Sequence, residues 1–433
     1  MTSAPPAAKL SPELLPEILG IPFTDEQLAA ITSPSSASVV IAGAGSGKTA
    51  VMSARVVWLV GSGTLPPEQV LGLTFTNKAA AELSQRVRLA LERLAGAGYV
   101  VTDEEPTIST YHAYAASLLR EYGLRAGLEP GAQLMVDATS FQLAERVVRR
   151  ADGPFSALRL KVRALTEAVV ALDNEMNEHL VSVDAVRSHD ARLLDTLSAV
   201  EQENGKLTTR PHDAKQAALA RTELLDLVAA FRREKVRRDV VDFGDQMAGA
   251  AVLAEAFSEI GEAERSRFGA VLLDEYQDTS IAQKRLLLAL FGQGYPITAV
   301  GDPFQAIYGW RGASVSNIME FTREFSLTDV ELPAHALSQN NRSAANILEL
   351  ANAIAAPLRE AHPNVTQLQP RPDLSVPGEI SLALFPTQAD EVDAISDDIA
   401  QRIGHGESPS HIAVLCRETK AFPDIYGALS SRG

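Results

Sequence analysis

Eight consecutive residues near the start of the chain combine small side chains with one lysine and one threonine, and they suit the binding of phosphate groups. They lie between the apolar run 38–42 and a helical run at 50–60, and they are Ala42, Gly43, Ala44, Gly45, Ser46, Gly47, Lys48 and Thr49. In a turn of small residues, consecutive backbone N–H groups can face an anion, and the start of the following helix adds a favourable dipole. We expect Lys48 to reach the β- and γ-phosphates of a nucleotide and the Thr49 hydroxyl to bind Mg²⁺. The alternative is a glycine-rich turn that contains Gly-Lys-Thr by chance.

Two adjacent carboxylates provide the second half of this chemistry. Asp274 and Glu275 directly follow the apolar run 270–273. Open parallel sheets bind ligands at the edge formed by the carboxyl ends of their strands. We expect Asp274 to hold Mg²⁺ opposite Thr49, and Glu275 to polarise the water that attacks the γ-phosphate. Capping of a helix by the two acids is the alternative. Together, the loop and the acids predict a site for ATP and Mg²⁺.

The elements that must position these residues alternate between short apolar runs and helical patterns. The runs at 38–42, 70–75, 270–274 and 297–300 are short and mostly aliphatic or β-branched, which is typical of a parallel sheet covered by helices on both faces. The fold class is therefore α/β. A long stretch with helical periodicity, 137–237, indicates an all-helical insertion. The strand-like segments 378–385 and 411–416 indicate a second α/β unit.

Composition sets limits on the class of protein. The chain has 433 residues, a net charge of −16 and one cysteine. A single cysteine, Cys416, allows no internal disulfide and suits a reducing cytosol. The sequence has no apolar run of about 18 residues, so we expect no membrane span. The acidic total argues mildly against a nucleic-acid partner, but phosphate binding depends on local rather than net charge.

Seven segments, in the right order, resemble those of the superfamily 1A DNA helicases typified by UvrD, Rep and PcrA. The segments are FTDEQLAAI (23–31), LTFTNKAAAEL (73–83), ISTYHAYAASLLREYG (108–123), VVDFGDQM (240–247), LLDEYQDTS (272–280), AVGDPFQAIYGWRGA (299–313) and LSQNNRS (337–343). The resemblance implies a RecA-like, P-loop NTPase fold. It divides the chain into a lead (1–20), a first RecA-like domain (21–136 and 238–330), a helical insertion (137–237) and a partial second RecA-like domain (331–433).

The resemblance also implies roles around the nucleotide. Gln27 would pair with the adenine edge, and Arg342 would neutralise charge on the γ-phosphate during transfer. Gln305, an uncharged amide just after an apolar strand, would sense the γ-phosphate and couple hydrolysis to movement. Two positions depart from the family pattern. Asn341 stands where an aromatic residue commonly stacks on adenine, and Ala50 stands where many relatives have arginine.

Aromatic side chains in this acidic chain are candidates for stacking on bases. Phe75, Tyr308 and Trp310 could grip unstacked bases with little sequence preference, and Arg311 adds a cation beside them. Tyr308 and Trp310 are two residues apart and would share one face of an extended segment. Core packing is the alternative for each ring. The resemblance further implies contacts to the DNA backbone from Asn77, Lys78, Thr110 and His112, although a lone histidine is as readily a core residue.

The densest basic run is Arg232, Arg233, Lys235, Arg237 and Arg238. As one helix it could contact the phosphates of duplex DNA. A solvated face paired with nearby acids explains the run equally well.

The resemblance predicts an ATP-dependent DNA translocase or helicase that acts on single-stranded DNA and on junctions with duplex, in the cytoplasm of a bacterial cell and associated with the nucleoid. Nothing in 344–433 resembles the later motifs V and VI, so we expect an N-terminal fragment with weak hydrolysis on its own. The segments 52–60 and 70–80 are also similar to helicase–nuclease subunits of actinobacterial AdnAB-type complexes, which implies a second motor or nuclease subunit. The alternatives are a nucleotide-dependent switch or clamp that moves no strand, and RNA as the substrate.

Overall fold

The computed structural model describes residues 9–99, 101–129, 131–153, 155–327, 333–362, 365–372 and 377–432. The chain forms two compact units, residues 1–376 and 377–433. Within the described residues, the structure contains no helix that is both long enough and apolar enough to cross a membrane.

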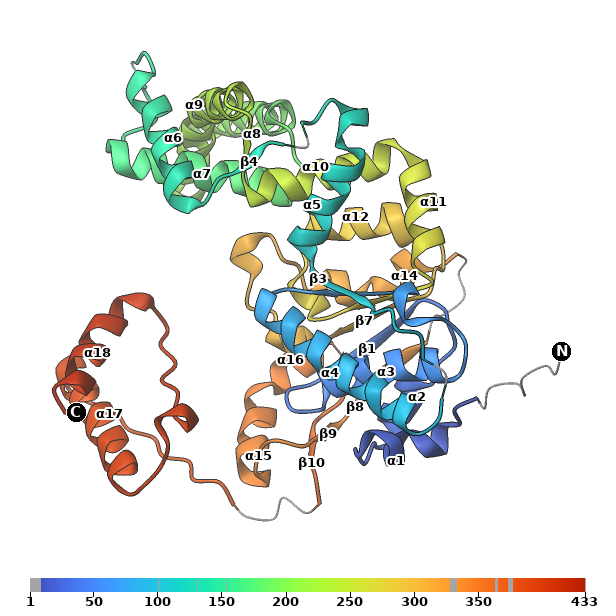
Figure 1. Cartoon of the computed structure of the whole chain (residues 1–433). Coiled ribbons are helices and arrows are strands. Elements are labelled where there is room, and N and C mark those ends of the chain that lie inside the picture. The colour runs from blue at the N-terminus through green and yellow to red at the C-terminus, as the bar shows by residue number, and fades with distance from the viewer. Residues whose placement is uncertain are drawn as a thin grey trace. The chain divides into compact units, whose positions relative to one another are not determined.

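A six-stranded parallel sheet lies at the centre of the first unit (Figure 1). In spatial order its strands are β3 (Thr107–Thr110), β2 (Val70–Thr74), β6 (Ala270–Leu273), β7 (Ile297–Gly301), β1 (Ser38–Ala42) and β8 (Ala334–Leu337). Every neighbouring pair is parallel. All six strands therefore end at the same edge, and the loops that follow them gather there. The predicted α/β fold class is confirmed.

The strands alternate their side chains between two hydrophobic cores, because successive residues of a strand point to opposite faces. Val39, Leu71 and Leu273 belong to one core, and Val40 and Leu272 to the other. The first core is completed by α5 (Tyr111–Tyr122), α10 (Phe243–Ala256), α11 (Ser258–Arg267), α12 (Ile281–Phe291), α13 (Ser316–Met319) and α14 (Phe321–Phe325). The second is completed by α1 (Leu15–Leu19), α2 (Asp25–Ile31), α3 (Lys48–Gly61) and α4 (Asn77–Gly96).

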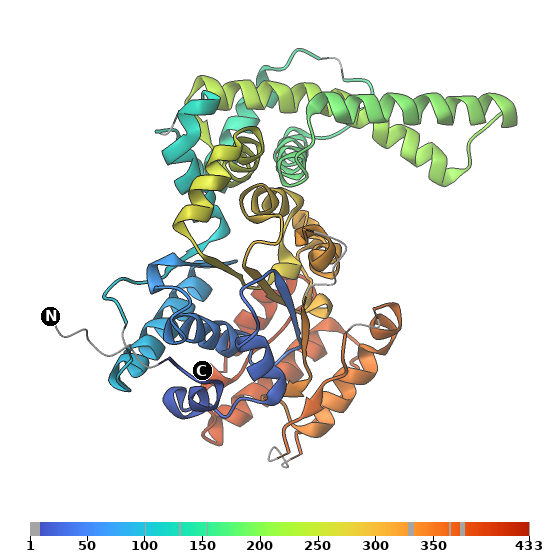
Figure 2. The same cartoon turned by 90° about the vertical axis from the view of Figure 1, so that its right-hand side faces the viewer.

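Four helices with a core of their own lie between β3 and β6 in the chain. They are α6 (Asp137–Arg150), α7 (Val162–Glu178), α8 (Val183–Asn204) and α9 (Thr209–Arg237). Figure 2 shows α8 and α9 as a long pair that extends beyond the other helices. The two connections to this group form a short parallel pair, β4 (Gln133–Leu134) beside β5 (Val240–Val241). We refer to these helices as the helical unit.

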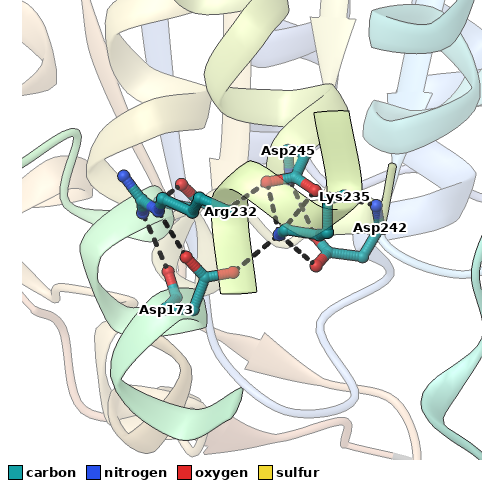
Figure 3. Close-up of polar contacts among 6 residues, drawn as sticks. Asp173, Arg232, Lys235, Asp242 and Asp245 are labelled. Atoms are coloured by element: carbon teal, nitrogen blue, oxygen red, sulfur yellow. Dashed lines mark hydrogen bonds and ion pairs between the residues drawn. The ribbon is translucent and has the colours of Figure 1, made fainter. Parts of the chain in front are cut away.

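A buried ionic cluster joins the helical unit to the first residues of α10 (Figure 3). The Lys235 ammonium lies 2.6 Å from Asp173 Oδ2, 2.8 Å from Asp242 Oδ2 and 2.7 Å from Asp245 Oδ2. Arg232 pairs with the other oxygen of Asp173. A buried charge is tolerated only when it is paired, and removal of one partner costs about 3–5 kcal/mol. The cluster therefore fixes α7 and α9 to α10.

The remaining elements of the first unit lie after β8. They are β9 (Gln339–Asn340), α15 (Ala345–Ile354), α16 (Ala356–Ala361) and β10 (Gln369–Pro370). Strand β9 pairs with β10 in parallel. Because β8 pairs with β1, residues 334–337 belong to the central sheet.

The second compact unit contains α17 (Gln388–Gly404) and α18 (Phe422–Ser430). The prediction of strands at 378–385 and 411–416 is wrong, because the structure has no strand within residues 377–432. The side chains of Leu382, Leu384 and Leu415 are 94–98% exposed. An alternating apolar segment becomes a strand only where a neighbour accepts its hydrogen bonds, and no such neighbour is present among these residues.

Candidate functional site

The phosphate-binding loop lies between β1 and α3, and two of its glycines have the left-handed backbone conformation that glycine adopts readily. Gly45 has φ +71° and Gly47 has φ +89°, and Gly47 directly precedes the first residue of α3. The Ser46 hydroxyl donates to the Gly43 carbonyl over 2.8 Å, which closes the turn. The first N–H groups of a helix have no partner within the helix, so those of α3 remain available to an anion. Ala42 is the last residue of β1, where extended backbone accepts alanine as readily as glycine.

Gln27 holds this loop from the side of α2. Its Nε2 donates to the Ser46 carbonyl over 2.8 Å, and its Oε1 accepts the Thr24 N–H over 3.0 Å. The side chain is buried as part of the capping box that begins α2. One amide hydrogen and one oxygen lone pair of Gln27 remain for another partner. The structure thus gives Gln27 a role in shaping the loop, and its predicted contact with adenine stays a prediction.

The segment around Asn340 holds the other side of the loop. Its Nδ2 donates to the Ala44 carbonyl over 2.6 Å, and its Oδ1 accepts the N–H groups of Arg342 and Ser343 over 2.9 and 2.7 Å. A Cβ at Gly45 would lie 2.9 Å from Arg342 Cβ, which is too close for a normal contact. Only glycine therefore allows the loop to lie so near this segment. The predicted residue Arg342 is therefore next to the phosphate-binding loop. Asn340 was not predicted, although it is part of the LSQNNRS segment.

The two predicted acids lie at the end of β6, beside the loop. Lys48 Nζ is 3.1 Å from Glu275 Oε2. Glu275 has left-handed backbone, φ +47° and ψ +44°, which is uncommon for a residue with a side chain. The Asp274 side chain is buried, and its Oδ1 accepts the Glu275 N–H over 3.0 Å. Burial raises the pKa of Asp274 to about 6, the charge of Glu275 adds to this rise, and Lys48 opposes it.

These residues fit a nucleotide with Mg²⁺. Thr49 is in the first turn of α3 and Asp274 directly follows β6, so a hydroxyl and a carboxylate lie at one edge of the sheet. Oxygen ligands of this kind are those Mg²⁺ prefers. Burial is the main cause of the raised pKa of Asp274, and a divalent cation bound there would favour its charged form.

A chain of hydrogen bonds leads from Glu275 away from the loop. Gln277 Nε2 donates to Glu275 Oε2 over 2.9 Å, and Gln277 Oε1 accepts the Asp302 N–H over 3.0 Å. The carboxylate of Asp302 accepts Gln305 Nε2 over 2.6 Å and the Phe304 N–H over 2.9 Å. The structure thus connects the predicted residues Glu275 and Gln305. Gln277 was not predicted, and its signal in the sequence was its place two residues after Glu275, within the LLDEYQDTS segment.

The three predicted aromatic residues form a cluster. The ring centroids of Phe75 and Tyr308 are 5.3 Å apart, those of Tyr308 and Trp310 are 6.3 Å apart, and Arg311 Cζ lies 4.5 Å from the Trp310 ring. Trp310 is 67% exposed. The segment is not extended as predicted, because residues 309–311 form a 3₁₀ turn. The turn brings the rings together by backbone curvature and leaves one face of the tryptophan accessible.

The other residues predicted to contact DNA lie at the same edge of the sheet, at the ends of β2 and β3. Asn77 and Lys78 are exposed in the first turn of α4. The Thr110 hydroxyl accepts the Ala113 N–H and so caps α5. His112 packs edge-on against Phe243, and burial, followed by the charge of Arg311, lowers its pKa. Thr110 and His112 therefore have structural partners besides any contact to DNA.

The basic run of α9 is mostly paired with acids, which favours the second of the two interpretations left open by the sequence over contacts with duplex phosphates. Arg232 and Lys235 belong to the buried ionic cluster, and Arg237 and Arg238 both contact Glu234. Arg233 is exposed and lines a hollow of about 260 Å³ on the helical unit. The structure therefore supports the interpretation of a helix face whose basic side chains are mostly paired with acids.

A glycine-rich loop between β1 and α3, with paired acids at the end of β6, defines a P-loop nucleotide-binding protein of the α/β class. The sequence model of the UvrD/REP helicase N-terminal domain matches residues 23–326. The chain belongs to this family, the superfamily 1A helicases.

Curated relatives agree with the family. The ATP-dependent DNA helicase UvrD1 of Mycobacterium leprae is 31% identical over 404 residues, which are 90% of this chain and 46% of the relative. DNA helicase II of Haemophilus influenzae is 28% identical over 94% of this chain and 50% of its own length. The ATP-dependent DNA helicase PcrA of Staphylococcus epidermidis is 28% identical, with 91% and 48% covered. The chain thus spans about half the length of the relatives it matches.

Proposed function

We propose that this chain is the nucleotide-driven part of an ATP-dependent DNA translocase or helicase of superfamily 1A. One observation carries the proposal: the phosphate-binding loop, the two acids and the aromatic cluster all follow strands of one parallel sheet and so lie along the same edge. A protein with this arrangement can bind a nucleotide and unstacked bases side by side. The relatives named as ATP-dependent DNA helicases support DNA as the polymer.

In this proposal each side chain acts on one part of the reaction. Lys48 and the N–H groups at the start of α3 bind the phosphates, and Thr49 and Asp274 hold Mg²⁺, which neutralises charge on the transferred phosphoryl group. Glu275 orients and deprotonates the attacking water, a role that contributes about 10²–10⁴-fold. Arg342 would provide a second positive charge. Gln27 would bind the adenine edge.

The same proposal assigns the single-stranded DNA to Phe75, Tyr308 and Trp310. Stacking contributes about 1–3 kcal/mol per base and tolerates any sequence. Asn77, Lys78, Thr110, His112 and Arg311 would contact the backbone beside it. Residues 334–337 of the segment 331–433 belong to the central sheet, so the residues after β8 would form part of a second RecA-like domain. Residues 137–237 would form the inserted domain. The complete protein would act on single-strand to duplex junctions in the bacterial cytoplasm, near the nucleoid, with a second motor or nuclease subunit as a possible partner.

The test is the rate of ATP hydrolysis by the full-length protein with and without single-stranded DNA. We expect stimulation of at least about tenfold, since a translocase completes its site only when the polymer is bound. A flat response would favour the alternative, a nucleotide-dependent switch or clamp. Single-stranded RNA of the same sequence is the matched control, and equal stimulation by RNA would overturn the choice of DNA. For the 433-residue chain alone we expect slow hydrolysis.

A further inference from the structure

We infer that Gln277 is a positioning residue that couples Glu275 to the aromatic cluster. The inference rests on the proposed function and extends it to a residue outside the predicted set. Gln277 is 1% exposed, and both ends of its amide are used. Its Nε2 donates to Glu275 Oε2 and its Oε1 accepts from Asp302 N.

The two ends of an amide are chemically different, so the Gln277 side chain fits between its partners in only one orientation. The NH₂ group only donates and the oxygen only accepts, so Gln277 can satisfy a carboxylate on one side and a backbone N–H on the other only in one orientation. Rotation or displacement of the Glu275 carboxylate must therefore move the amide or break a buried hydrogen bond. The side chain thus transmits a change at Glu275 to Asp302.

Close packing restricts how Gln277 can respond. A Cβ at Gly301 would lie 2.3 Å from Gln277 Oε1 and 2.7 Å from the side chain of Ile318, so this glycine provides the space that the amide occupies. Gly301 is the last residue of β7 and directly precedes Asp302. The amide is therefore held against the end of a buried strand, where sideways movement is blocked.

From Asp302 the connection continues into the loop that carries the aromatic residues. Asp302 caps the short 3₁₀ turn 303–305 and binds the Gln305 side chain. The loop then leads through Ile307 to Tyr308, whose ring packs on Phe75. Four successive contacts of 3.1, 2.9, 3.0 and 2.6 Å thus link Lys48 to Gln305 through Glu275, Gln277 and Asp302. Lys48 is the residue that a bound nucleotide must engage.

The chain contains two tryptophans, Trp58 and Trp310, which makes the coupling measurable without hydrolysis. In a Trp58→Phe background, Trp310 is the only tryptophan of the 433-residue chain. We expect binding of a non-hydrolysable ATP analogue with Mg²⁺ to change its fluorescence. Gln277→Met keeps the volume and removes every hydrogen bond of the amide, including a longer one of 3.4 Å from Nε2 to Asp278 Oδ2. We expect it to reduce the amplitude of that change at least about fivefold while the Kd for the analogue changes less than about threefold.

Gln283→Met is the matched control. Gln283 is also a buried glutamine, 3% exposed, but its amide caps α12 by accepting the Ser280 N–H. Gln283→Met therefore also removes a buried amide, and we expect a similar drop in Tm, but it leaves the contacts between Lys48 and Gln305 unchanged. We expect this control to keep the full fluorescence amplitude. An amplitude in Gln277→Met within about twofold of the parent, or an equal loss in both variants, would overturn the inference. So would a parent protein whose Trp310 does not respond.

The DNA-stimulated reaction of the full-length protein separates this inference from the proposed function. We expect Gln277→Met to lower the ratio of stimulated to basal hydrolysis at least about tenfold. If wild-type hydrolysis is not stimulated by DNA, the proposed function fails and the inference with it. If wild type is stimulated and Gln277→Met keeps the ratio, only the inference fails.

Discussion

Asn340 Nδ2 donates a hydrogen bond of 2.6 Å to the Ala44 carbonyl, across 296 residues of sequence. The same side chain accepts the Arg342 N–H, so one amide orders the phosphate-binding loop and the turn that carries the arginine. We expect Asn340→Ala to weaken nucleotide binding about three- to tenfold, since a hydrogen bond of this kind contributes about 0.5–1.5 kcal/mol. Titration with a fluorescent nucleotide measures the change.

Gln369→Ala is the control for that experiment. It removes an exposed amide from β10, the strand that pairs with β9, and leaves the backbone pairing intact. Its affinity for nucleotide should equal that of wild type. If Asn340→Ala binds as tightly as this control, the contact with Ala44 has no energetic role in binding.

Lys48 and Glu275 form one ion pair, but we expect their replacement to affect different steps, nucleotide binding for Lys48 and hydrolysis for Glu275. Lys48→Ala removes the cation that faces the phosphates, and we expect nucleotide binding to be lost. Glu275→Gln keeps the hydrogen-bonding shape but cannot accept a proton, so binding should persist while hydrolysis falls about 10²–10⁴-fold. Equilibrium binding and single-turnover hydrolysis of the full-length protein separate the two effects. Equal loss of binding in both variants would contradict the assignment of Glu275 to chemistry.

Trp310 is exposed and lies outside the buried cores, where its neighbours are Tyr308 and Arg311. We expect Trp310→Ala in the full-length protein to raise the DNA concentration needed for half-maximal stimulation about 5- to 150-fold, the range that corresponds to a lost stacking contact of about 1–3 kcal/mol. Basal hydrolysis should not change. A parallel fall in the basal rate would instead give Trp310 a structural role.

Lys235 compensates three carboxylates, of which Asp173 and Asp242 are buried and Asp245 is partly buried, so its loss should destabilise the joint between the helical unit and α10. We expect Lys235→Met to lower the free energy of unfolding by about 3–5 kcal/mol, because it leaves buried charges unpaired. Urea denaturation gives this value. Arg233→Met, an exposed position two residues away on the same helix, is the control and should change stability by less than about 0.5 kcal/mol. Similar losses in both variants would argue against the buried cluster.

Asp274 makes stability depend on pH in a direction opposite to that of a paired carboxylate. Its folded-state pKa of about 6 lies above the ordinary value of 3.8, so the folded protein holds this proton more tightly than the unfolded chain does. The stabilising contribution is therefore full at low pH and is lost as pH rises toward 6. A shift of about two pKa units corresponds to roughly 3 kcal/mol.

Asp274→Asn removes this dependence and keeps an acceptor for the Glu275 N–H. In EDTA at pH 8 we therefore expect a higher Tm for Asp274→Asn than for wild type, with a smaller difference at pH 5. Scanning calorimetry at the two pH values is the measurement. Asp103→Asn, at an exposed position, should show no such difference. A lower Tm for Asp274→Asn at pH 8 would show that the charge is compensated by the protein.

The sequence predicted the central strands because their signal is local. The short, mostly apolar runs at 38–42, 70–75 and 297–300 form β1, β2 and β7, whose residues are buried on both faces. Strand β3 was not predicted, because TIST is short and polar and becomes a strand only beside β2. The segment 378–385 failed in the opposite way: its alternating pattern is that of a strand, but pairing depends on neighbours that a pattern does not contain.

The site was predictable to the same extent. The phosphate-binding loop is one contiguous segment, and the two acids are adjacent to each other, so each could be recognised from the sequence. The parallel sheet then brings Lys48 to Glu275 across 227 residues. Gln277 and Asn340 escaped prediction because their roles consist of contacts with Asp302 and Ala44, which are far away in the chain. The roles assigned to the predicted residues stay predictions until they are measured.

The parallel pair β4 and β5 has a consequence for how the protein can change over time. Gln133 and Leu134 lie beside Val240 and Val241, so the chain leaves and re-enters the α/β domain at neighbouring points. Lengthening α8 and α9 by whole turns would alter neither point, and the register of the six strands would not shift. Evolution, or an engineer, could therefore resize or exchange those helices while the machinery for nucleotides keeps its geometry, provided that Lys235 retains its three acidic partners.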